Sequence, residues 1–151
     1  NRRLFLTKLN DTIVYSKRNK QTFCIAFLDI DNFKEINDTK GHNIGDEVLQ
    51  QVSNLLKESI REVDSIARWG GEEIVILFSE IDINNAQELT ERLRIVLEHN
   101  IKIQEILSYN LTASIGLTQF IQTDDVDSII KRSDDAMYLS KNSGKNKITV
   151  L

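Results

Sequence analysis

Two pairs of acidic residues stand at the ends of apolar segments of the chain. Asp29 and Asp31 close the apolar run 22–30, and Glu72 and Glu73 follow a pair of glycines just before a second apolar run. Carboxylates are poor strand residues, and a backbone made only of glycine lets a ligand come close. Acids beside such a bend indicate a site for a metal ion or a phosphorylated molecule.

The glycine pair Gly70-Gly71 lies between two strand-like segments, 65–69 and 73–79. This arrangement predicts a tight hairpin, because the primed turns that suit hairpins need positive φ at their central positions. The hairpin would present both glutamates at its turn.

The run 22–30 is continuously apolar and predicts a central strand that is buried on both faces. If this strand lies beside the hairpin, Asp29 and Asp31 meet the two glutamates at one edge of the sheet. Like charges held together are costly unless a cation neutralises them. Mg²⁺ suits such a site because it binds a few carboxylates together with water and substrate phosphates.

Hydrophobic periodicity supplies the other elements. The segment 38–42 reads as a turn, and the whole pattern predicts an α+β fold with helices packed on a mainly antiparallel sheet. Helices are predicted over 3–18, 33–37 and 43–60, from Asn84 to Leu97 and from Val126 to Met137, and further strands over 101–107, 111–120 and 148–150.

Composition limits the class of protein. The 151 residues fit one domain, and the net charge of -4 argues against broad nucleic-acid binding. No apolar run approaches the length of a membrane span, and no signal-peptide pattern is visible. The single cysteine, Cys24, cannot form an internal disulfide and is predicted to be a small core residue in a reducing, cytoplasmic setting.

Several short motifs extend this pattern over nearly the whole chain. In their order and spacing they resemble the GGDEF domain of diguanylate cyclases. The resemblance implies a palm-like fold of the nucleotidyl-cyclase or ferredoxin-like kind. The motifs are Asp29–Asp38, Gly41–Asp46, Arg68–Glu73, Ser114–Gly116 and Ala136–Asn146.

The resemblance also implies an activity, the condensation of two GTP molecules into cyclic di-GMP and two pyrophosphates. Each subunit of a homodimer would bind one GTP, and the 3′-hydroxyl of each nucleotide would attack the α-phosphate of the other. The chain is then a single GGDEF catalytic domain over 1–151. It is expected to be the C-terminal part of a longer protein whose N-terminal sensor domain, and any membrane anchor, lie outside this chain.

By the same resemblance, Asp29, Glu72 and the backbone carbonyl of Ile30 hold Mg²⁺, for which Mn²⁺ could substitute. The metal would neutralise the triphosphate and help the 3′-hydroxyl to become a nucleophile. Glu73 is an auxiliary metal or base residue, and Lys34 completes the candidate catalytic set with Glu72 and Glu73. The alternative is that these acids form only a solvated acidic rim on the protein surface.

Asn37 and Asp46 correspond to the pair that reads guanine in the family. An amide can bond the purine edge, and a carboxylate can accept from the N1–H and 2-amino groups of guanine. Adenine lacks those donors, so GTP would be preferred over ATP. The alternatives are a turn residue for Asn37 and an ordinary first-turn helix acid for Asp46.

The resemblance further assigns contacts with the phosphates. The lysines would act as point charges, although each could instead be an ordinary solvent-facing lysine. A lysine replaces the arginine usual at position 145, which removes bidentate phosphate binding. The phosphate and backbone set is Lys34, Phe33 (its side chain in the core), Gly70, Gly71, Lys141 and Lys145.

Arg61 and Asp64 resemble the family's Arg-x-x-Asp inhibitory site, which binds dimers of the product. Arginine can stack on guanine and bond its edge, and aspartate can accept from it. Arg92 would supply a second arginine to this site. The alternative is an exposed charged loop.

Two other functions stay open. One is a catalytically weak GGDEF domain that binds GTP or cyclic di-GMP as a sensing module. Ile74 in place of the family's aromatic residue, Lys145 and the abrupt start of the chain favour it. The other is a different palm-type nucleotidyl transferase, which the guanine pair and the lack of a basic groove oppose.

Overall fold

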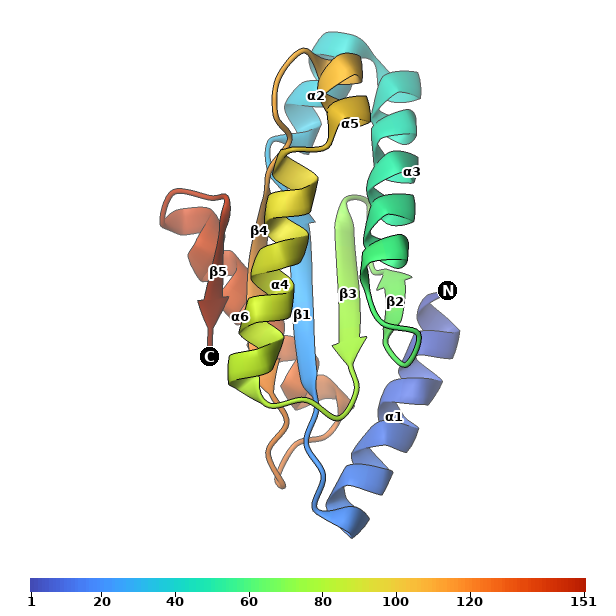
Figure 1. Ribbon diagram of the computed structural model, residues 1–151, viewed down its shortest axis with the longest axis vertical. Coiled ribbons are helices and arrows are strands. Elements are labelled where there is room, and N and C mark those ends of the chain that lie inside the picture. The colour runs from blue at the N-terminus through green and yellow to red at the C-terminus, as the bar shows by residue number, and fades with distance from the viewer.

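A five-stranded sheet lies between two layers of helices in the computed structural model, which describes all residues 1–151 (Figure 1). The strand order is β2-β3-β1-β4-β5, and every neighbouring pair is antiparallel except β4 and β5. The α+β prediction is therefore confirmed. The strands are β1 (Cys24–Ile30), β2 (Ser65–Arg68), β3 (Glu73–Phe78), β4 (Ala113–Gln119) and β5 (Lys147–Val150). The helices are α1 (Arg2–Asn19), α2 (Phe33–Lys40), α3 (His42–Ser59), α4 (Ile83–Glu98), α5 (Ile101–Leu107) and α6 (Val126–Asn142).

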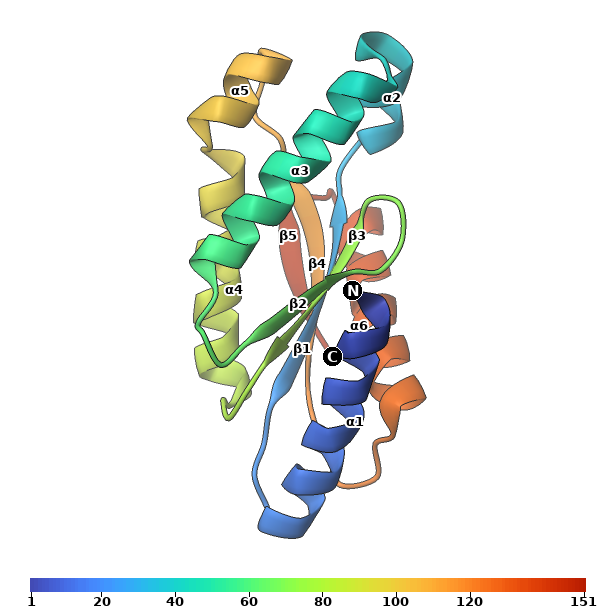
Figure 2. The same cartoon turned by 90° about the vertical axis from the view of Figure 1, so that its right-hand side faces the viewer.

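The central strand β1 is buried on both faces, as its apolar run predicts. Leu28 and Ile30 pack into the core beneath α3, α4 and α5, whereas Ile25 and Phe27 pack into a second core beneath α1 and α6. The two helical layers cover opposite faces of the sheet (Figure 2). Both faces of β1 thus lose contact with water, which is the main favourable term in folding.

The predicted role of Cys24 as a core residue is confirmed. Its side chain is fully buried in β1. Burial, with a further contribution from the charge of Asp82, raises the pKa of the Cys24 thiol to about 12. The thiolate that would be reactive is therefore absent at neutral pH.

The segment 101–107 forms helix α5, so the prediction of a strand there is wrong. Asn100 caps this helix by accepting a hydrogen bond from the N–H of Ile103 at 2.9 Å. Ile103 and Leu107, four residues apart, are its buried side chains. The apolar alternation at the start of the segment resembled a strand, but the helical spacing of the two buried residues prevails.

The predicted turn over 38–42 is also wrong for most of its length. Helix α2 continues to Lys40, and only Gly41, with φ of 90°, interrupts the helical backbone before α3 begins at His42. Glycine tolerates this φ because it has no Cβ.

The glycine pair of the hairpin does not form the predicted primed turn. Neither Gly70 nor Gly71 has a positive φ, and Trp69 and Gly70 both donate hydrogen bonds to the carbonyl of Glu73, at 2.7 and 3.4 Å. The glycines provide clearance instead. A Cβ on Gly70 would lie 2.6 Å from a carboxylate oxygen of Glu73, whereas a Cβ on Gly71 would meet nothing within 4 Å.

No helix combines the length and the hydropathy that crossing a bilayer requires.

Gly116 of β4 lets α6 approach the sheet closely. A Cβ built on it would lie 2.1 Å from the carbonyl oxygen of Ser133 and 2.2 Å from the amide of Met137. These are backbone atoms of α6 and cannot turn aside. We therefore predict that Gly116→Ala lowers the free energy of unfolding in urea by about 3 kcal/mol, as overpacking does. Gly71→Ala, which adds the same methyl group in open space, should leave that free energy nearly unchanged, and equal losses would contradict the argument.

Candidate functional site

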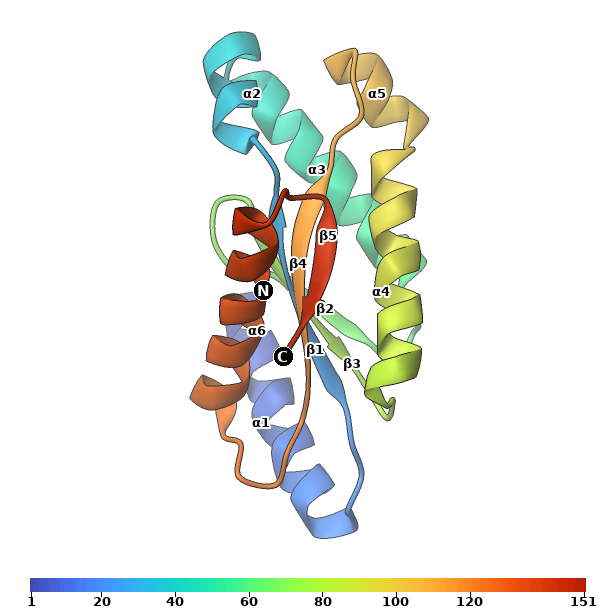
Figure 3. The same ribbon diagram turned by 90° about the vertical axis from the view of Figure 1, so that its left-hand side faces the viewer.

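The candidate site lies at one end of the sheet, where β1 ends, the β2–β3 turn closes and α6 reaches its C-terminus (Figure 3). Asp29 is paired across the ladder with Glu73, and the N–H of Ile30 donates to the carbonyl of Glu72 at 3.3 Å. The prediction that β1 and the hairpin are neighbours is confirmed. The acids from both segments therefore share one corner of the molecule.

The ammonium group of Lys141 occupies the centre of this corner. Its Nζ lies 2.9 Å from a carboxylate oxygen of Asp29 and 2.9 Å from one of Asp31, and it donates to the carbonyl of Ile30 at 3.1 Å. Although burial works against the charged amine, hydrogen bonds to both aspartates raise the pKa of Lys141. A positive charge is therefore held among carboxylate and carbonyl oxygens.

Asp31 anchors the corner instead of facing outward. Its side chain accepts hydrogen bonds from Ser114 at 2.6 Å, from Thr112 at 2.7 Å and from the backbone N–H of Asn146 at 3.0 Å, besides the contact with Lys141. Burial alone would raise its pKa, but these bonds hold the pKa of Asp31 below its usual range. Both carboxylate oxygens are thereby used within the protein.

The other acids of the corner repel one another. Burial, opposed by Lys141 and assisted by Asp31, raises the pKa of Asp29. Burial and the charge of Asp29 raise the pKa of Glu72 and of Glu73. The corner thus carries more negative charge than one ammonium group neutralises.

Asp134 of α6 belongs to the same charged corner and was missed by the sequence analysis. Its pKa is raised by burial and by the charges of Asp135 and Asp29. It precedes Lys141 by seven residues, two helical turns, so both project from one side of α6. That spacing was the signal that could have identified it.

The oxygen donors of this corner fit a hard divalent cation. Asp29 and the carbonyl of Ile30 already hold a positive charge, that of Lys141. No group of three or more Asp, Glu, His or Cys side chains has the spacing of a complete protein-only metal site.

The remaining predicted phosphate-binding residues surround the corner. Lys145 donates from Nζ to the side-chain oxygen of Asn32 at 2.7 Å. Lys34 is exposed in the first turn of α2, and the side chain of Phe33 is buried. The first N–H groups of a helix have no partner within it, and they favour anions. Helix α2 therefore offers free donors just beyond the end of β1.

The predicted guanine-reading residues lie on two packed helices, Asn37 on α2 and Asp46 on α3. A Cβ on Gly45 would lie 1.9 Å from the side-chain oxygen of Asn37. The amide of Asn37 therefore rests on α3 at Gly45, the residue that precedes Asp46. Gly45 is not among the predicted site residues, although a glycine inside an amphipathic helix is itself a signal of close approach.

The Arg61–Asp64 segment lies beside Ser79, at the opposite end of the hairpin from Glu72. Arg61 donates to both oxygens of Asp64, at 3.0 and 2.7 Å, and to the carbonyl of Ser79 at 2.8 Å. Asp64 also accepts from the N–H groups of Arg61 and Ser79. The side chain of Asp64 is buried, so the exposed-loop interpretation is wrong for this residue.

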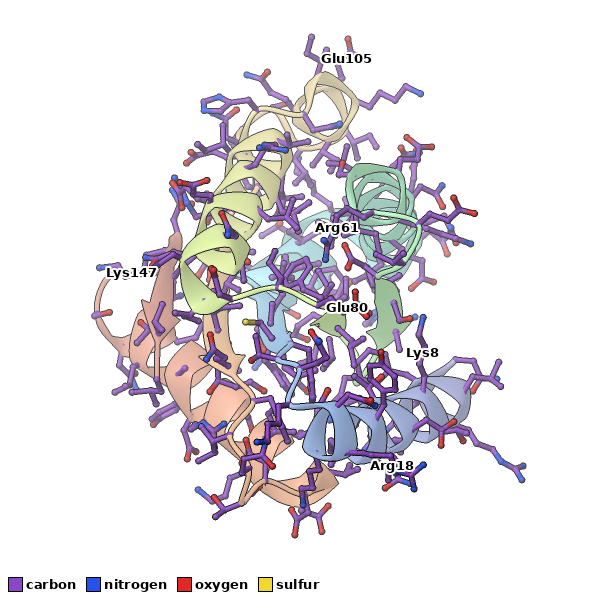
Figure 4. All side chains as sticks on the ribbon, turned by 60° about the horizontal axis from the view of Figure 1, so that its bottom comes forward. Lys8, Arg18, Arg61, Glu80, Glu105 and Lys147 are labelled. Carbon is purple, nitrogen blue, oxygen red and sulfur yellow. The ribbon has the colours of Figure 1, made fainter.

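Arg61 remains partly exposed, and its side chain is labelled in Figure 4 near the end of α3. A cavity of about 420 Å³ lies between α1 and this segment, and Arg61, Asp64 and Lys8 are among its lining residues. Arg92 is exposed on α4 and forms no hydrogen bond with Arg61. The structure therefore brings Arg61 and Asp64 together but does not join Arg92 to them.

The sequence matches a family model described as "Diguanylate cyclase, GGDEF domain" over residues 1–147. Diguanylate cyclase A of Treponema denticola is 37% identical over 140 residues, which cover 92% of this chain and 38% of that protein. Diguanylate cyclase DosC of Escherichia coli is 34% identical over 149 residues, which cover 98% of this chain and 32% of that protein. The chain thus spans about a third of the length of these curated relatives.

Solved structures show the same fold. The active GGEEF domain of a diguanylate cyclase from Vibrio cholerae superposes with a TM-score of 0.92 at 30% identity, covering 99% of this chain and 96% of that one. The GGDEF domain of DgcB from Caulobacter crescentus, solved in complex with c-di-GMP, gives a TM-score of 0.91 at 29% identity. That match covers 99% of this chain and 90% of the other.

The buried contacts of Asp31 generate a prediction about stability. Asp31→Asn should lower the free energy of unfolding by about 3 kcal/mol at neutral pH, because it removes the more deeply buried of the two carboxylates that pair with Lys141. Because the pKa of Asp31 is lowered in the folded state, its ionised side chain stabilises the fold fully above the unfolded pKa of about 3.9. This stabilisation is lost as the pH falls through the folded pKa of Asp31. Urea unfolding of both proteins at several pH values should show the difference shrinking in acid. A difference that stays constant would contradict this assignment.

Proposed function

The chain belongs to the GGDEF domain family of diguanylate cyclases, and from this premise we propose that it condenses two GTP molecules into cyclic di-GMP and two pyrophosphates. The observation that carries the proposal is the cation-holding corner at the end of β1. There Asp29 and the carbonyl of Ile30 surround a positive charge beside Glu72 and Glu73.

Asp29, Glu72 and the carbonyl of Ile30 would hold Mg²⁺, with Mn²⁺ as an alternative. When bound, the metal supplies charge neutralisation for the triphosphate and lowers the pKa of the attacking hydroxyl. Glu73, paired with Asp29 across the ladder and with a raised pKa, is suited to accept a proton at that hydroxyl.

The phosphates would be bound by groups that border the corner. Lys141 and Lys145 provide positive charge, and the first turn of α2 provides the N–H groups of Phe33 and Lys34. Gly71 faces open space, so a nucleotide can lie against the turn. These contacts orient the α-phosphate for attack, and such orientation accounts for much of the rate enhancement in phosphoryl transfer.

Guanine would be read by Asn37 and Asp46. Their side chains offer an amide and a carboxylate on adjacent turns of α2 and α3, and guanine alone presents both complementary donors to the carboxylate. An adenine would leave Asp46 without a partner, which is how polar sites reject analogues.

A homodimer is part of the proposal. Each chain would offer one such nucleotide site, and each nucleotide would supply its 3′-hydroxyl to the α-phosphate held by the other subunit. A sensor domain N-terminal to this chain would control how the two catalytic domains meet.

Product inhibition through Arg61, Asp64 and Arg92 is a further part of the proposal. Because Asp64 is saturated by its own loop, cyclic di-GMP would bind through the exposed part of the Arg61 guanidinium and through Arg92. The cavity beside Arg61 offers room for one base of the ligand.

A binding module without turnover is the second candidate. Lys145 favours it, because a lysine binds phosphate through a single point charge where the family has an arginine fork. Ile74 does not favour it, since this residue is buried and packed in the core beneath the hairpin.

The first experiment is incubation with GTP and Mg²⁺ followed by identification of the product. We expect cyclic di-GMP, with a rate that rises faster than linearly with protein concentration because catalysis needs two subunits. Glu72→Gln should lower kcat by a factor of about 100 or more, the loss expected when electrostatic stabilisation of the transition state is removed. GTP binding without product at any protein concentration would support the binding module.

A second prediction concerns the metal and does not depend on turnover. Because its pKa is raised, ionised Glu72 disfavours the folded state at neutral pH, so Glu72→Gln should melt at the wild-type temperature or a few degrees above it. Mg²⁺ with 3′-deoxy-GTP, which lacks the attacking hydroxyl, should raise the melting temperature of the wild type more than that of the variant. Glu105→Gln on α5 is the matched control and should respond like the wild type. If Glu72→Gln responds as much as the wild type, Glu72 does not bind the metal.

A third prediction concerns base recognition. Gly45→Ala should favour helix α3 by up to about 1 kcal/mol, yet its methyl group would displace the amide of Asn37. We expect kcat/KM for GTP to fall roughly tenfold, a loss of about 1.4 kcal/mol in transition-state binding. Gln50→Ala, an exposed change on the same helix, is the control. Unchanged GTP kinetics in Gly45→Ala would show that Asn37 does not read the base.

A further inference from the structure

The loop between α6 and β5 has an unusual backbone. Three successive residues, Gly144, Lys145 and Asn146, have positive φ angles of 114°, 62° and 46°. Positive φ is uncommon for residues other than glycine, and it persists where surrounding contacts impose it. Since this loop carries Lys145 and follows Lys141, the contacts that hold it also set the position of both lysines.

The side chain of Asn146 is held between two charged residues of α4. Its amide oxygen accepts from Arg94 at 2.7 Å, and its amide nitrogen donates to Glu98. Glu91 in turn binds the guanidinium group of Arg94. An asparagine amide satisfies a cation and an anion at once because it carries both an acceptor and a donor. An aspartate at position 146 would instead face the carboxylate of Glu98.

The backbone of Asn146 continues the connection into the site. Its N–H donates to Asp31 at 3.0 Å, and the other oxygen of Asp31 accepts from Lys141, which also contacts Asp29. A continuous series of hydrogen bonds therefore runs from α4 on one face of the sheet to α6 on the other. The loop and β5 lie between these two helices (Figure 3), and Lys147 marks the strand beside α4 (Figure 4).

We propose that Arg94, Glu98 and Asn146 form a positioning cluster for binding of the triphosphate. This inference rests on the proposed function. The three side chains bond one another and the loop, and the loop holds Lys141 and Lys145 toward the nucleotide phosphates. They are positioning residues because they act through the lysines. The guanine-reading residues lie on α2 and α3, outside this series of contacts.

The test compares ligands with and without phosphates. Asn146→Asp should weaken binding of 3′-deoxy-GTP with Mg²⁺ about tenfold, while binding of guanosine, which lacks phosphate, stays unchanged. The double variant Asn146→Asp with Glu98→Gln should recover most of this loss, since a glutamine amide can donate to the new carboxylate while Arg94 still donates to it. For each protein, binding would be measured by isothermal titration calorimetry and the free energy of unfolding by urea unfolding.

Asn54→Asp is the matched control, because Asn54 is exposed and its side chain bonds only Gln50 on the same helix. It should bind both ligands like the wild type. If Asn146→Asp does not fold, Asn146→Ser keeps the backbone bond to Asp31 and should show the same difference between the two ligands with a smaller amplitude.

Three results would be decisive. Wild-type binding by Asn146→Asp in an active protein overturns the positioning cluster alone. Equal weakening for guanosine and 3′-deoxy-GTP also overturns it, because the cluster would then serve only general stability. A wild type that neither binds 3′-deoxy-GTP nor turns over GTP overturns the proposed function itself.

Discussion

The buried pairing of Asp31 with Lys141 is the interaction on which the site depends. The carboxylate of Asp31 receives hydrogen bonds from β4, from the end of α6 and from the α6–β5 loop, while its own backbone continues β1. One residue thereby fixes four segments against one another. A charge in such surroundings is stabilised by its partner, so the loss of Asp31 would weaken the contacts among all four segments.

The contacts of Asp31 hold in place a group of acidic side chains that would otherwise repel one another. Asp29, Glu72 and Glu73 all have raised pKa values, because burial and mutual repulsion disfavour their ionised forms. Asp31, a few ångströms away in the same corner, has a lowered pKa because its bonds outweigh its burial. The contrast separates the two tasks: Asp31 stabilises the fold, and the other three hold negative charge that a bound cation would relieve.

Features with a strong periodic or compositional signal were predictable from the sequence. The apolar run of β1 and its place beside the hairpin follow from which side chains can be buried. The seven-residue segment 101–107 was misassigned because a short apolar segment fits either period. The turn at Gly70 and Gly71 was misassigned because Trp69 and Gly70 both donate to the backbone carbonyl of Glu73, and neither glycine needs the positive φ of a primed turn. The link from Asn146 to Glu98 spans 48 positions and depends on the topology of the sheet.

The short connection between β1 and α2 joins the two halves of the site. Only Asp31 and Asn32 separate the strand that ends at the acids from the helix that carries Asn37. Asn32 adopts a left-handed φ of 57°, which turns the chain into α2, and its side chain accepts from Lys145. The backbone of Asn32 therefore sets the direction of α2, and with it the position of Asn37, the residue proposed to read guanine. Lys145 bonds only the side chain of Asn32, whereas the backbone of Asn32 and the packing of α2 on α3 place Asn37, so the residues proposed for the base and for the phosphates meet at one connection but are held by separate contacts.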